Sequence, residues 1–516
     1  MTWTLACVLA LFAALVVVVL YDLTQTSHAI LRNFPVIGHF RYLLETVGPE
    51  LRQYVVANND EERPFSRDER RWIYASSKHQ NNYFGFGTDN DLEQSSSYLI
   101  IKQVAFPLGT PHPGEAGHDP LYAVPCAKVM GGYRGRTHAF RPTSIINTSA
   151  MSYGALSSAA VEAINRGVKL AGALQNTGEG GVASHHGHGG DLIWQLGTGY
   201  FGARDAKGGF SLERLLATLD GRPIRAIEIK ISQGAKPGLG GVLPGVKVTP
   251  EIAAIRGVPA WHDCISPSSH TAFRDVDELL DFVERIADAT GLPVGIKSAV
   301  GDMGFWKDLA RLMAMTGRGV DFITVDGGEG GTGAAPLVFV DHVALPFKVG
   351  FSRVYRELAR EGVHSRVVLI GSGKLGFPNV GLLAMALGCD MVNIAREAML
   401  AIGCIQAQRC HTGHCPTGVT TQNAWLMRGL EPTHKAARLA NYIVTLRKEL
   451  LQFSHARGQV HPALVPLDAF EIIDPGFNAR SARDVFGYGA NGSAWSPADR
   501  EIIAQLMMKS PAAATV

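Results

Sequence analysis

The stretch FITVDGGEGG (322–331) begins as a short apolar and β-branched run and ends in an acidic residue followed by glycines. Such a run is typical of a buried parallel strand whose carboxyl end delivers polar groups to an active face. Seven further segments between Pro142 and Gln422 share this pattern and alternate with helix-length amphipathic segments, as repeated βα units do. These segments are SIINTS (144–149), ALQNT (173–177), AIEIKIS (226–232), DCIS (263–266), PVGIKS (293–298), VVLIGSG (367–373) and MVNIA (391–395).

Eight parallel strands are the number that closes a TIM (β/α)8 barrel. An open doubly wound sheet is the alternative, because strand count alone does not separate the two folds. No GxGxxG motif follows the first strand, which disfavours the doubly wound fold. We therefore predict an α/β protein with a TIM barrel over residues 136–430. An α+β lead-in region over 23–135 precedes it, and a helical and irregular C-terminal extension over 431–516 follows it.

Residues 1–22 are predicted to form a transmembrane helix. The run from Thr2 to Tyr21 carries no charge, and at about 1.5 Å per residue it covers most of the ~30 Å apolar thickness of a bilayer. A cleaved signal peptide is the alternative, but no Lys or Arg precedes the run and no small-x-small site follows it. The first cations, Arg32 and Arg41, come after the helix. The positive-inside rule then predicts a single-pass anchor in the inner (plasma) membrane, with the catalytic domain in the cytoplasm.

The charges of the chain are balanced, since 48 Lys and Arg against 46 Asp and Glu give a formal net charge of +2. They are mixed along the chain, with no basic stripe and no aromatic-flanked Arg/Lys cluster, so we expect no nucleic-acid partner. Seven cysteines are too few for a disulfide scaffold in 516 residues, and three of them crowd into one short segment. This clustering favours a metal centre in a reducing compartment.

The three clustered cysteines are Cys404, Cys410 and Cys415, with five and then four residues between them. Three thiolates this close can converge on one soft-ligand centre, which is iron-sulfur, zinc or Cu(I). A zinc site would need a fourth ligand, for which His411 and His414 are placed. Zinc sites, however, usually show two short paired spacings, which this segment lacks. Unliganded core cysteines are the less favoured interpretation.

Two stretches, LIGSGKLG (369–376) and NIAREAML (393–400), lie at the ends of the last two predicted strands. In TIM barrels a phosphate group is often held after strands seven and eight by backbone N–H groups and a helix amino terminus. A lone Gly-Ser-Gly is common in turns. The prediction therefore rests on the place of this segment after the seventh of the predicted strands. The residues predicted to form the phosphate cradle are Gly371, Ser372, Gly373 and Ala395.

The stretch DGGEGGTGAAP (326–336) has five glycines among its first eight residues. This composition suits a backbone pressed against a flat ligand, and it equally suits a mobile loop. In IKISQGAKPGLGG (229–241), Lys230, Gln233 and Lys236 lie beside or near glycines and have room to reach an anionic ligand. A lysine on a barrel strand is costly to bury without a partner, and an anionic reduced flavin would provide one.

Six motifs follow one another along more than half of the chain. They are SAMSYGALS (149–157), QNTGEGG (175–181), IKISQGAKPGLGG, IAAIRG (252–257), DGGEGGTGA (326–334) and the C-x5-C-x4-C loop. In this order they closely resemble the FMN-binding synthase domain of glutamate synthase. The lead-in region and the anchor resemble the stand-alone, membrane-associated members of that family.

The resemblance implies a TIM barrel with FMN at its carboxyl-terminal mouth, supplied with single electrons by a [3Fe-4S] cluster. The cluster ligands that it implies are Cys404, Cys410 and Cys415. The FMN-binding residues that it implies are Met151, Ser152, Asn176, Gln195, Lys230, Lys297, Gly327, Gly328, Gly331, Thr332, Gly333, Gly371, Ser372, Gly373 and Ala395.

The resemblance also implies a reaction, the reduction of 2-iminoglutarate, formed from 2-oxoglutarate and ammonia, to L-glutamate. Its implied catalytic residues are Lys230, Gln233 and Lys236. Its implied substrate-binding residues are Glu179, Gln233, Lys236 and Arg256. Where the family usually has prolines and histidines, this chain reads ISPSSHTAF (265–273), so another keto acid or imine remains open as the acceptor.

The chain shows no glutaminase motif, no pyridine-nucleotide domain and no second cluster motif. We therefore expect ammonia, or another amine, to come from solution or a partner. The electron donor is expected to be separate: a ferredoxin, an NAD(P)H dehydrogenase subunit or a membrane carrier. Three alternatives stay open: an N-methylglutamate synthase-like enzyme, a non-catalytic electron-transfer subunit of a membrane complex, and an FMN-dependent isomerase, which would not need the cysteine loop.

Overall fold

The computed structural model of the chain describes residues 2–25, 27–59, 61–83, 85–88, 90–92, 95, 97–115, 117–474, 476, 478–489 and 495–508. The chain divides into two compact units, of which the first ends at Arg70 and the second begins at Arg71. The division falls within helix α4 (Arg67–Ser77) and lies inside the region predicted from the sequence as the lead-in.

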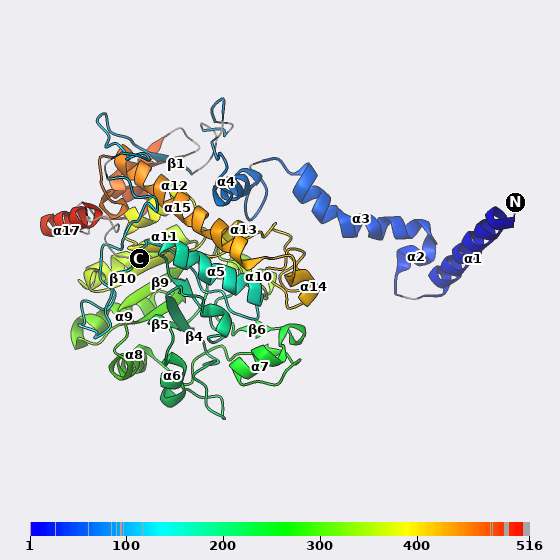
Figure 1. Ribbon diagram of the computed structural model, residues 1–516, viewed down its shortest axis with the longest axis horizontal. Coiled ribbons are helices and arrows are strands. Elements are labelled where there is room, and N and C mark those ends of the chain that lie inside the picture. The colour runs from blue at the N-terminus through cyan, green and yellow to red at the C-terminus, as the bar shows by residue number, and fades with distance from the viewer. Residues whose placement is uncertain are drawn as a thin grey trace. The chain divides into compact units, whose positions relative to one another are not determined.

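Eight parallel strands of the second unit form a closed barrel, which confirms the predicted fold (Figure 1). Neighbours in the sequence are neighbours in the barrel, and the last strand pairs with the first through Val392 and Ile146. This is the strand order of a TIM barrel. The strands are β2 (Ile146–Thr148), β3 (Gln175–Asn176), β4 (Leu192–Leu196), β5 (Ile224–Lys230), β8 (Val294–Ala299), β9 (Phe322–Asp326), β10 (Val368–Ser372) and β11 (Met391–Ile394).

One strand that was predicted for the barrel lies outside it, and one barrel strand was missed. The segment DCIS does not enter the barrel, because β5 pairs directly with β8. Instead β7 (Cys264–Ile265) forms an antiparallel pair with β6 (Val242–Leu243), in the insertion that follows the carboxyl end of β5. The missing barrel strand is β4, whose sequence LIWQL is buried along its whole length.

Helices follow most of the strands and cover the outside of the barrel (Figure 1). Side-chain caps define where several of them begin: Ser157 accepts from the backbone N–H of Ala160 at the start of α5, and Asp275 does the same for α8. The covering helices are α5 (Ser158–Ala171), α6 (Leu212–Leu219), α8 (Val276–Thr290), α9 (Gly304–Thr316), α11 (Phe347–Arg360), α12 (Pro378–Leu387) and α13 (Arg396–Ala401). Loops carry the short helices α7 (Pro250–Arg256), α10 (Leu337–His342) and α14 (Ala424–Met427), and 3-10 turns at Ser184–His186, Gly245–Lys247 and His364–Arg366.

The amino-terminal end of the barrel is closed by an apolar cluster. Strand residues with inward-pointing side chains form it together with Cys126 and Met130, from the segment that precedes β2. Because side chains alternate along a strand, the inward positions further up the same strands point toward the mouth. These cluster residues are Leu174, which directly precedes β3, and the strand residues Ile193, Ala226, Phe322, Val368, Ile370 and Met391.

The C-terminal extension packs on the barrel through a long helix, α15 (Pro432–Ala456), whose main neighbour is α5. It also contains strands where the sequence suggested irregular structure. Strand β12 (Phe470–Ile473) lies between β13 (Ala479–Ser481) and β1 (Tyr98–Ile101) in an antiparallel sheet. Two 3-10 turns, Pro462–Leu464 and Leu467–Ala469, and the helices α16 (Ala482–Val485) and α17 (Pro497–Met508) complete the extension.

The first unit consists of helices. Helix α1 (Thr2–Thr24) contains a window of mean hydropathy 2.8 and is long and apolar enough to cross a membrane by length and composition. The same features would suit a signal sequence. After it come α2 (Ala29–Asn33), α3 (Ile37–Leu51) and a π-helical turn at Arg52–Val56.

Arg447 on α15 provides a test of the packing between the extension and the barrel. Its guanidinium is buried and donates to the carbonyls of Ala171, at 2.9 Å, and Leu121, at 2.8 Å. We expect Arg447→Ala to lower the free energy of unfolding by about 3 kcal/mol, because it leaves two carbonyls unpaired and removes packing. The urea midpoint of the full chain in detergent measures this. The exposed His434→Ala is the control, and an Arg447→Ala midpoint equal to the control's would contradict the assignment.

Candidate active site at the carboxyl end of the barrel

A cavity of about 90 Å³ lies at the carboxyl ends of the barrel strands. Its lining is mostly polar and comes from the ends of the strands and the loops that follow them, which is where TIM barrels hold their active sites. The lining residues are Ser149, Ala150, Ser152, Glu179, Gln195, Lys230, Gln233, Lys297, Asp326, Gly330, Gly331, Ser372, Gly373, Lys374, Asn393, Ala395, Arg396 and Glu397.

Beneath this cavity lies a buried carboxylate, that of Glu228 on β5, which the sequence analysis missed. Its Oε1 accepts hydrogen bonds from the side-chain amides of Asn176, at 2.8 Å, and Gln195, at 2.6 Å. The hydroxyl of Thr324, on β9, donates to its Oε2 at 2.6 Å. The signal was present, because an acidic residue between two isoleucines on a buried strand must point inward to a partner.

Lys230 lies one inward position above Glu228 on the same strand. Its ammonium donates to Oε1 of Glu179 at 2.7 Å and to Oε1 of Gln233. Burial alone would raise the pKa of Glu179, but the neighbouring cations, with Lys230 foremost, outweigh burial and hold the pKa below its ordinary value. The three side chains therefore form one charge-balanced group at the mouth.

Two further predicted substrate residues lie near this group without lining the cavity. The ammonium of Lys236 donates to the carbonyl of Gly240 at 2.9 Å, and burial, followed by the charge of Lys230, lowers the pKa of Lys236. The buried guanidinium of Arg256 donates to the carbonyl of Tyr153 at 3.0 Å and stacks over the ring of Phe201. Its Nε has no hydrogen-bond partner in the described part of the chain.

The predicted phosphate cradle is assembled at the other side of the cavity. Ser372, Gly373 and Ala395 line it, whereas Gly371 lies just below. A Cβ on Gly373 would lie 3.2 Å from Cα of Gly327, so the two glycine-containing loops approach closely only because Gly373 has no side chain. The backbone N–H of Ala395 already donates to the carboxylate of Glu397, at 3.3 Å.

Two cations beside this cradle were not singled out from the sequence. Lys374 follows Gly373 directly, and Arg396 begins α13, and both line the cavity. The guanidinium of Arg396 donates to the carbonyl of Glu329 and lies against Gly331. A cation just after a strand end is the signal that could have identified them, since such positions face the mouth of a barrel.

The glycine-rich loop after β9 contributes only in part to the cavity. Gly331 lines the cavity, and Gly327 and Gly328 lie against the loop before α11, while Thr332 and Gly333 do not line it. Neither Met151 nor Asn176 lines it either. Lys297 does line it, and its ammonium lies 3.4 Å from Oδ2 of Asp326.

The three clustered cysteines lie on the loop that follows α13. A buried lysine, Lys247, donates to the carbonyls of Cys410 and Thr420, both at 2.7 Å, and so fixes this loop to the insertion after β5. Burial would raise the pKa of the Cys415 thiol, but hydrogen bonds from nearby threonines outweigh it and lower the pKa. Among the described residues, no group of three or more His, Cys, Asp or Glu side chains is placed to hold a metal ion.

The two implied cofactors fit this chain to different degrees. For FMN the donor set fits, with cations and backbone N–H groups at one side and the Lys230 group at the other. The cavity is smaller than the ~300–1,000 Å³ of usual ligand sites, so lining side chains such as Arg396 must move for FMN to enter. An iron-sulfur cluster is bound by thiolates, so the side chains of Cys404, Cys410 and Cys415 are chemically suitable ligands. Their present arrangement, however, does not bring the three together around one site.

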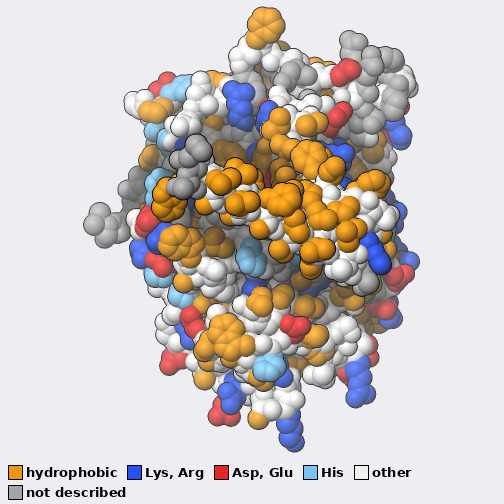
Figure 2. Space-filling model, turned by 90° about the vertical axis from the view of Figure 1, so that its right-hand side faces the viewer, with side chains coloured by type: hydrophobic (Ala, Val, Ile, Leu, Met, Phe, Trp, Pro, Cys, Tyr) orange, Lys and Arg blue, Asp and Glu red, His pale blue; other side chains and the backbone are white. Residues whose placement is uncertain are grey.

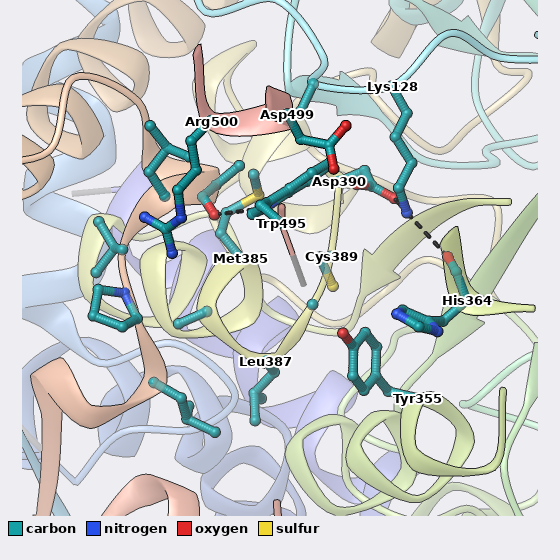
Figure 3. A pocket seen from close by; sticks show the side chains of 18 of the residues that line it. Lys128, Tyr355, His364, Met385, Leu387, Cys389, Asp390, Trp495, Asp499 and Arg500 are labelled. Carbon is teal, nitrogen blue, oxygen red and sulfur yellow. Dashed lines mark hydrogen bonds and ion pairs between the residues drawn. The ribbon is translucent and has the colours of Figure 1, made fainter. Parts of the chain in front are cut away.

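A second cavity, of about 620 Å³, lies at the opposite end of the barrel, next to α12 and the C-terminal extension (Figure 3). Lys128 points into it and donates to Asp390 at 2.9 Å and to the carbonyls of His364, at 3.1 Å, and Val367, at 2.9 Å. Asp390 precedes β11, whose carboxyl end lines the first cavity. The length of the strand therefore separates the two cavities.

Comparisons with known proteins identify the family. Residues 135–460 match the family described as "Conserved region in glutamate synthase". The chain is 38% identical over 466 residues to the glutamate synthase large subunit-like protein YerD of Bacillus subtilis, which covers 85% of this chain and 88% of that protein. It is 37% identical over 311 residues to the archaeal glutamate synthase (NADPH) of Methanocaldococcus jannaschii, covering 60% of this chain and 58% of that protein.

Solved structures give only a distant likeness. A flavocytochrome b2 with sulfite bound aligns at 12% identity and a TM-score of 0.44, over 88% of this chain and 89% of that chain. This likeness is too low to inform on either fold or function. The family match and the close relative are sufficient on their own: the chain belongs to the glutamate synthase family and is a glutamate synthase-like oxidoreductase.

Proposed function

We propose that the chain reduces 2-iminoglutarate, formed from 2-oxoglutarate and ammonia, to L-glutamate, using FMN and a [3Fe-4S] cluster. The observation that carries the proposal is the charged group of Lys230, Glu179 and Gln233 at the mouth of the barrel. It lies in the same cavity as the glycine loops and the cations Lys374 and Arg396. A site of this kind suits an anionic cofactor beside an anionic substrate.

FMN would be held at two ends. Its phosphate would be bound by the backbone of Ser372 and Gly373 and by the side chains of Lys374 and Arg396. Its ring would contact Gln195 and Lys230, whose positions are fixed by Glu228 and Glu179. When bound, FMN supplies the two-electron transfer to the imine carbon.

The substrate would be bound through its two carboxylates. Lys236 and Arg256 do not line the cofactor cavity, but both cations lie close enough to Glu179 to lower the pKa of its carboxyl. The ketone and ammonia lose water to form C=N, and two electrons and two protons then convert it to CH–NH. The ammonium of Lys230, held between Glu179 and Gln233, would be the proton donor for this step.

The cluster would be bound by the three clustered cysteines. It requires that Cys404, Cys410 and Cys415 draw together around iron, because a thiolate cluster needs all its ligands within bonding distance. The Cys loop lies near the glycine-rich loop, since a Cβ on Gly333 would be 3.8 Å from Cβ of Cys410. We propose that a separate donor, a ferredoxin, an NAD(P)H dehydrogenase subunit or a membrane carrier, delivers the electrons.

We also propose that α1 crosses the inner membrane once and that the barrel lies in the cytoplasm. The support is an 18-residue window of the helix that has a mean hydropathy of 2.8 and contains no buried residue. Leaving such a surface in water is unfavourable, by about 25 cal/mol per Å². The first cations, Arg32 and Arg41, follow the helix, and Lys and Arg residues that flank a membrane helix are more frequent on its cytoplasmic side.

Arg256→Ala tests the assignment of the substrate carboxylate site. Loss of a charge-assisted hydrogen bond of about 2–3 kcal/mol should lower kcat/KM for 2-oxoglutarate plus ammonium by about 30- to 150-fold. Flavin content should not change, because Arg256 does not line the cofactor cavity. Steady-state rates with a reduced viologen as donor provide the measurement. The exposed Arg214→Ala is the control, and a kcat/KM for Arg256→Ala equal to the control's would contradict this role.

Cys410→Ser tests the cluster. With one of three thiolates replaced by a hydroxyl, iron and acid-labile sulfide should fall to background and the EPR signal of the oxidised cluster should disappear. FMN should remain bound at its wild-type content. Elemental analysis and EPR of anaerobically prepared protein measure both. Cys7→Ser, in α1, is the matched control, and unchanged iron in Cys410→Ser would exclude Cys410 as a ligand.

A further inference from the structure

Helix α3 presents a stripe of apolar side chains to solvent. These residues recur every three or four positions, so helical periodicity places them on one face. Their side chains are between 39% and 78% exposed. The apolar stripe, which continues into the π-helical turn, consists of Ile37, Phe40, Leu44, Val47, Leu51 and Val55.

The polar residues of α3 are arranged around this stripe. By the same periodicity, Thr46 lies on the opposite face, whereas Arg41, Glu45 and Arg52 lie along one margin of the stripe, where Arg41 forms an ion pair with Glu45. Arginines at such margins can rest their stems on an apolar phase and keep their charge at its polar boundary. This is the arrangement of an amphipathic helix that lies in a membrane surface.

A buried carboxylate joins the start of α3 to the end of α1. Asp22, near the end of α1, has no exposed surface. One of its oxygens accepts the backbone N–H of Val36 at 2.9 Å, and the other contacts Nε2 of His39 at 2.9 Å. Val36, a β-branched residue, has φ of 66°, a conformation that needs such support. The first turn of α3 is thereby held at the end of α1.

The length of α1 sets the depth of this junction. Its 23 residues span about 35 Å, slightly more than the ~30 Å apolar core of a bilayer. If α1 crosses the membrane, Asp22 therefore lies near the headgroups, and α3 starts in the same layer. Figure 2 shows hydrophobic side chains gathered in a band across the face that is turned toward the viewer.

We infer that α3 lies along the cytoplasmic surface of the membrane, with the apolar stripe in the lipid and Arg41 and Arg52 among the phosphates. The inference rests on the proposed membrane span of α1. It gives the chain two contacts with the bilayer, one that crosses it and one that lies in it. The occupant of the stripe is lipid, because the stripe begins where α1 leaves the apolar core.

Site-specific photocrosslinking of the full chain in nanodiscs tests this inference. Three variants are compared, Phe40→p-benzoylphenylalanine in the stripe, Thr46→p-benzoylphenylalanine on the opposite face and Phe12→p-benzoylphenylalanine within α1. The nanodiscs contain phosphatidylethanolamine and phosphatidylglycerol with an alkyne tag on the acyl chain. We expect position 40 to form at least ten times more tagged-lipid adduct than position 46, and an amount comparable with position 12.

Each other outcome separates the explanations. A crosslink from position 40 to a second copy of the chain, or to the barrel of the same chain, without lipid adduct would overturn the inference and identify what covers the stripe. Equal lipid adducts at positions 40 and 46 would also overturn it, since no face would then be preferred. Lipid adduct at position 12 alone would overturn the inference about α3 but leave the α1 anchor intact. Absence of lipid adduct at position 12 would contradict the anchor as well.

Discussion

The polar interior of the barrel depends on one buried carboxylate, that of Glu228. A charge inside a packed barrel is tolerated only when hydrogen bonds replace the water that it loses. Glu228 obtains them from Asn176, Gln195 and Thr324, which come from three different strands. In doing so it fixes two amides whose side chains the family resemblance associates with the flavin, and it separates the apolar floor of the barrel from the polar mouth.

The next inward layer repeats this arrangement with the charges exchanged. Lys230 follows Glu228 at the period of a strand and pairs with Glu179, while Lys297 pairs with Asp326 on the adjacent strand. Each of these two lysines has a carboxylate partner, so this layer is rich in charge and yet charge-balanced. An anionic ligand that enters this layer would compete with Glu179 and Asp326 for the two lysines. The lysines could then bind the ligand without a large change in the net charge of the layer.

Much of this organisation was predictable from the sequence, because inward and outward side chains alternate. The strands in FITVDG, VVLIGSG and MVNIA were identified correctly, because short runs rich in β-branched and apolar residues are typical of buried strands. The strand LIWQL was missed, and DCIS was wrongly chosen, because both are short apolar runs and only the direct pairing of β5 with β8 separates them. Glu228, Lys374 and Arg396 could have been recognised from their places on or just after strands. The arrangement of the three cysteines could not, because a loop position depends on contacts such as those of Lys247 that no local pattern records.

The central claim is that this mouth binds a flavin and passes electrons to an imine. The most direct measurement is anaerobic titration of the purified full-length protein, with FMN quantified first and the flavin absorbance then followed. We predict about one FMN per chain, bleached by reductant and restored by 2-oxoglutarate together with ammonium, with one glutamate formed per flavin reoxidised. Protein that carries no flavin, or a reduced flavin that 2-oxoglutarate and ammonium leave bleached, would contradict the claim.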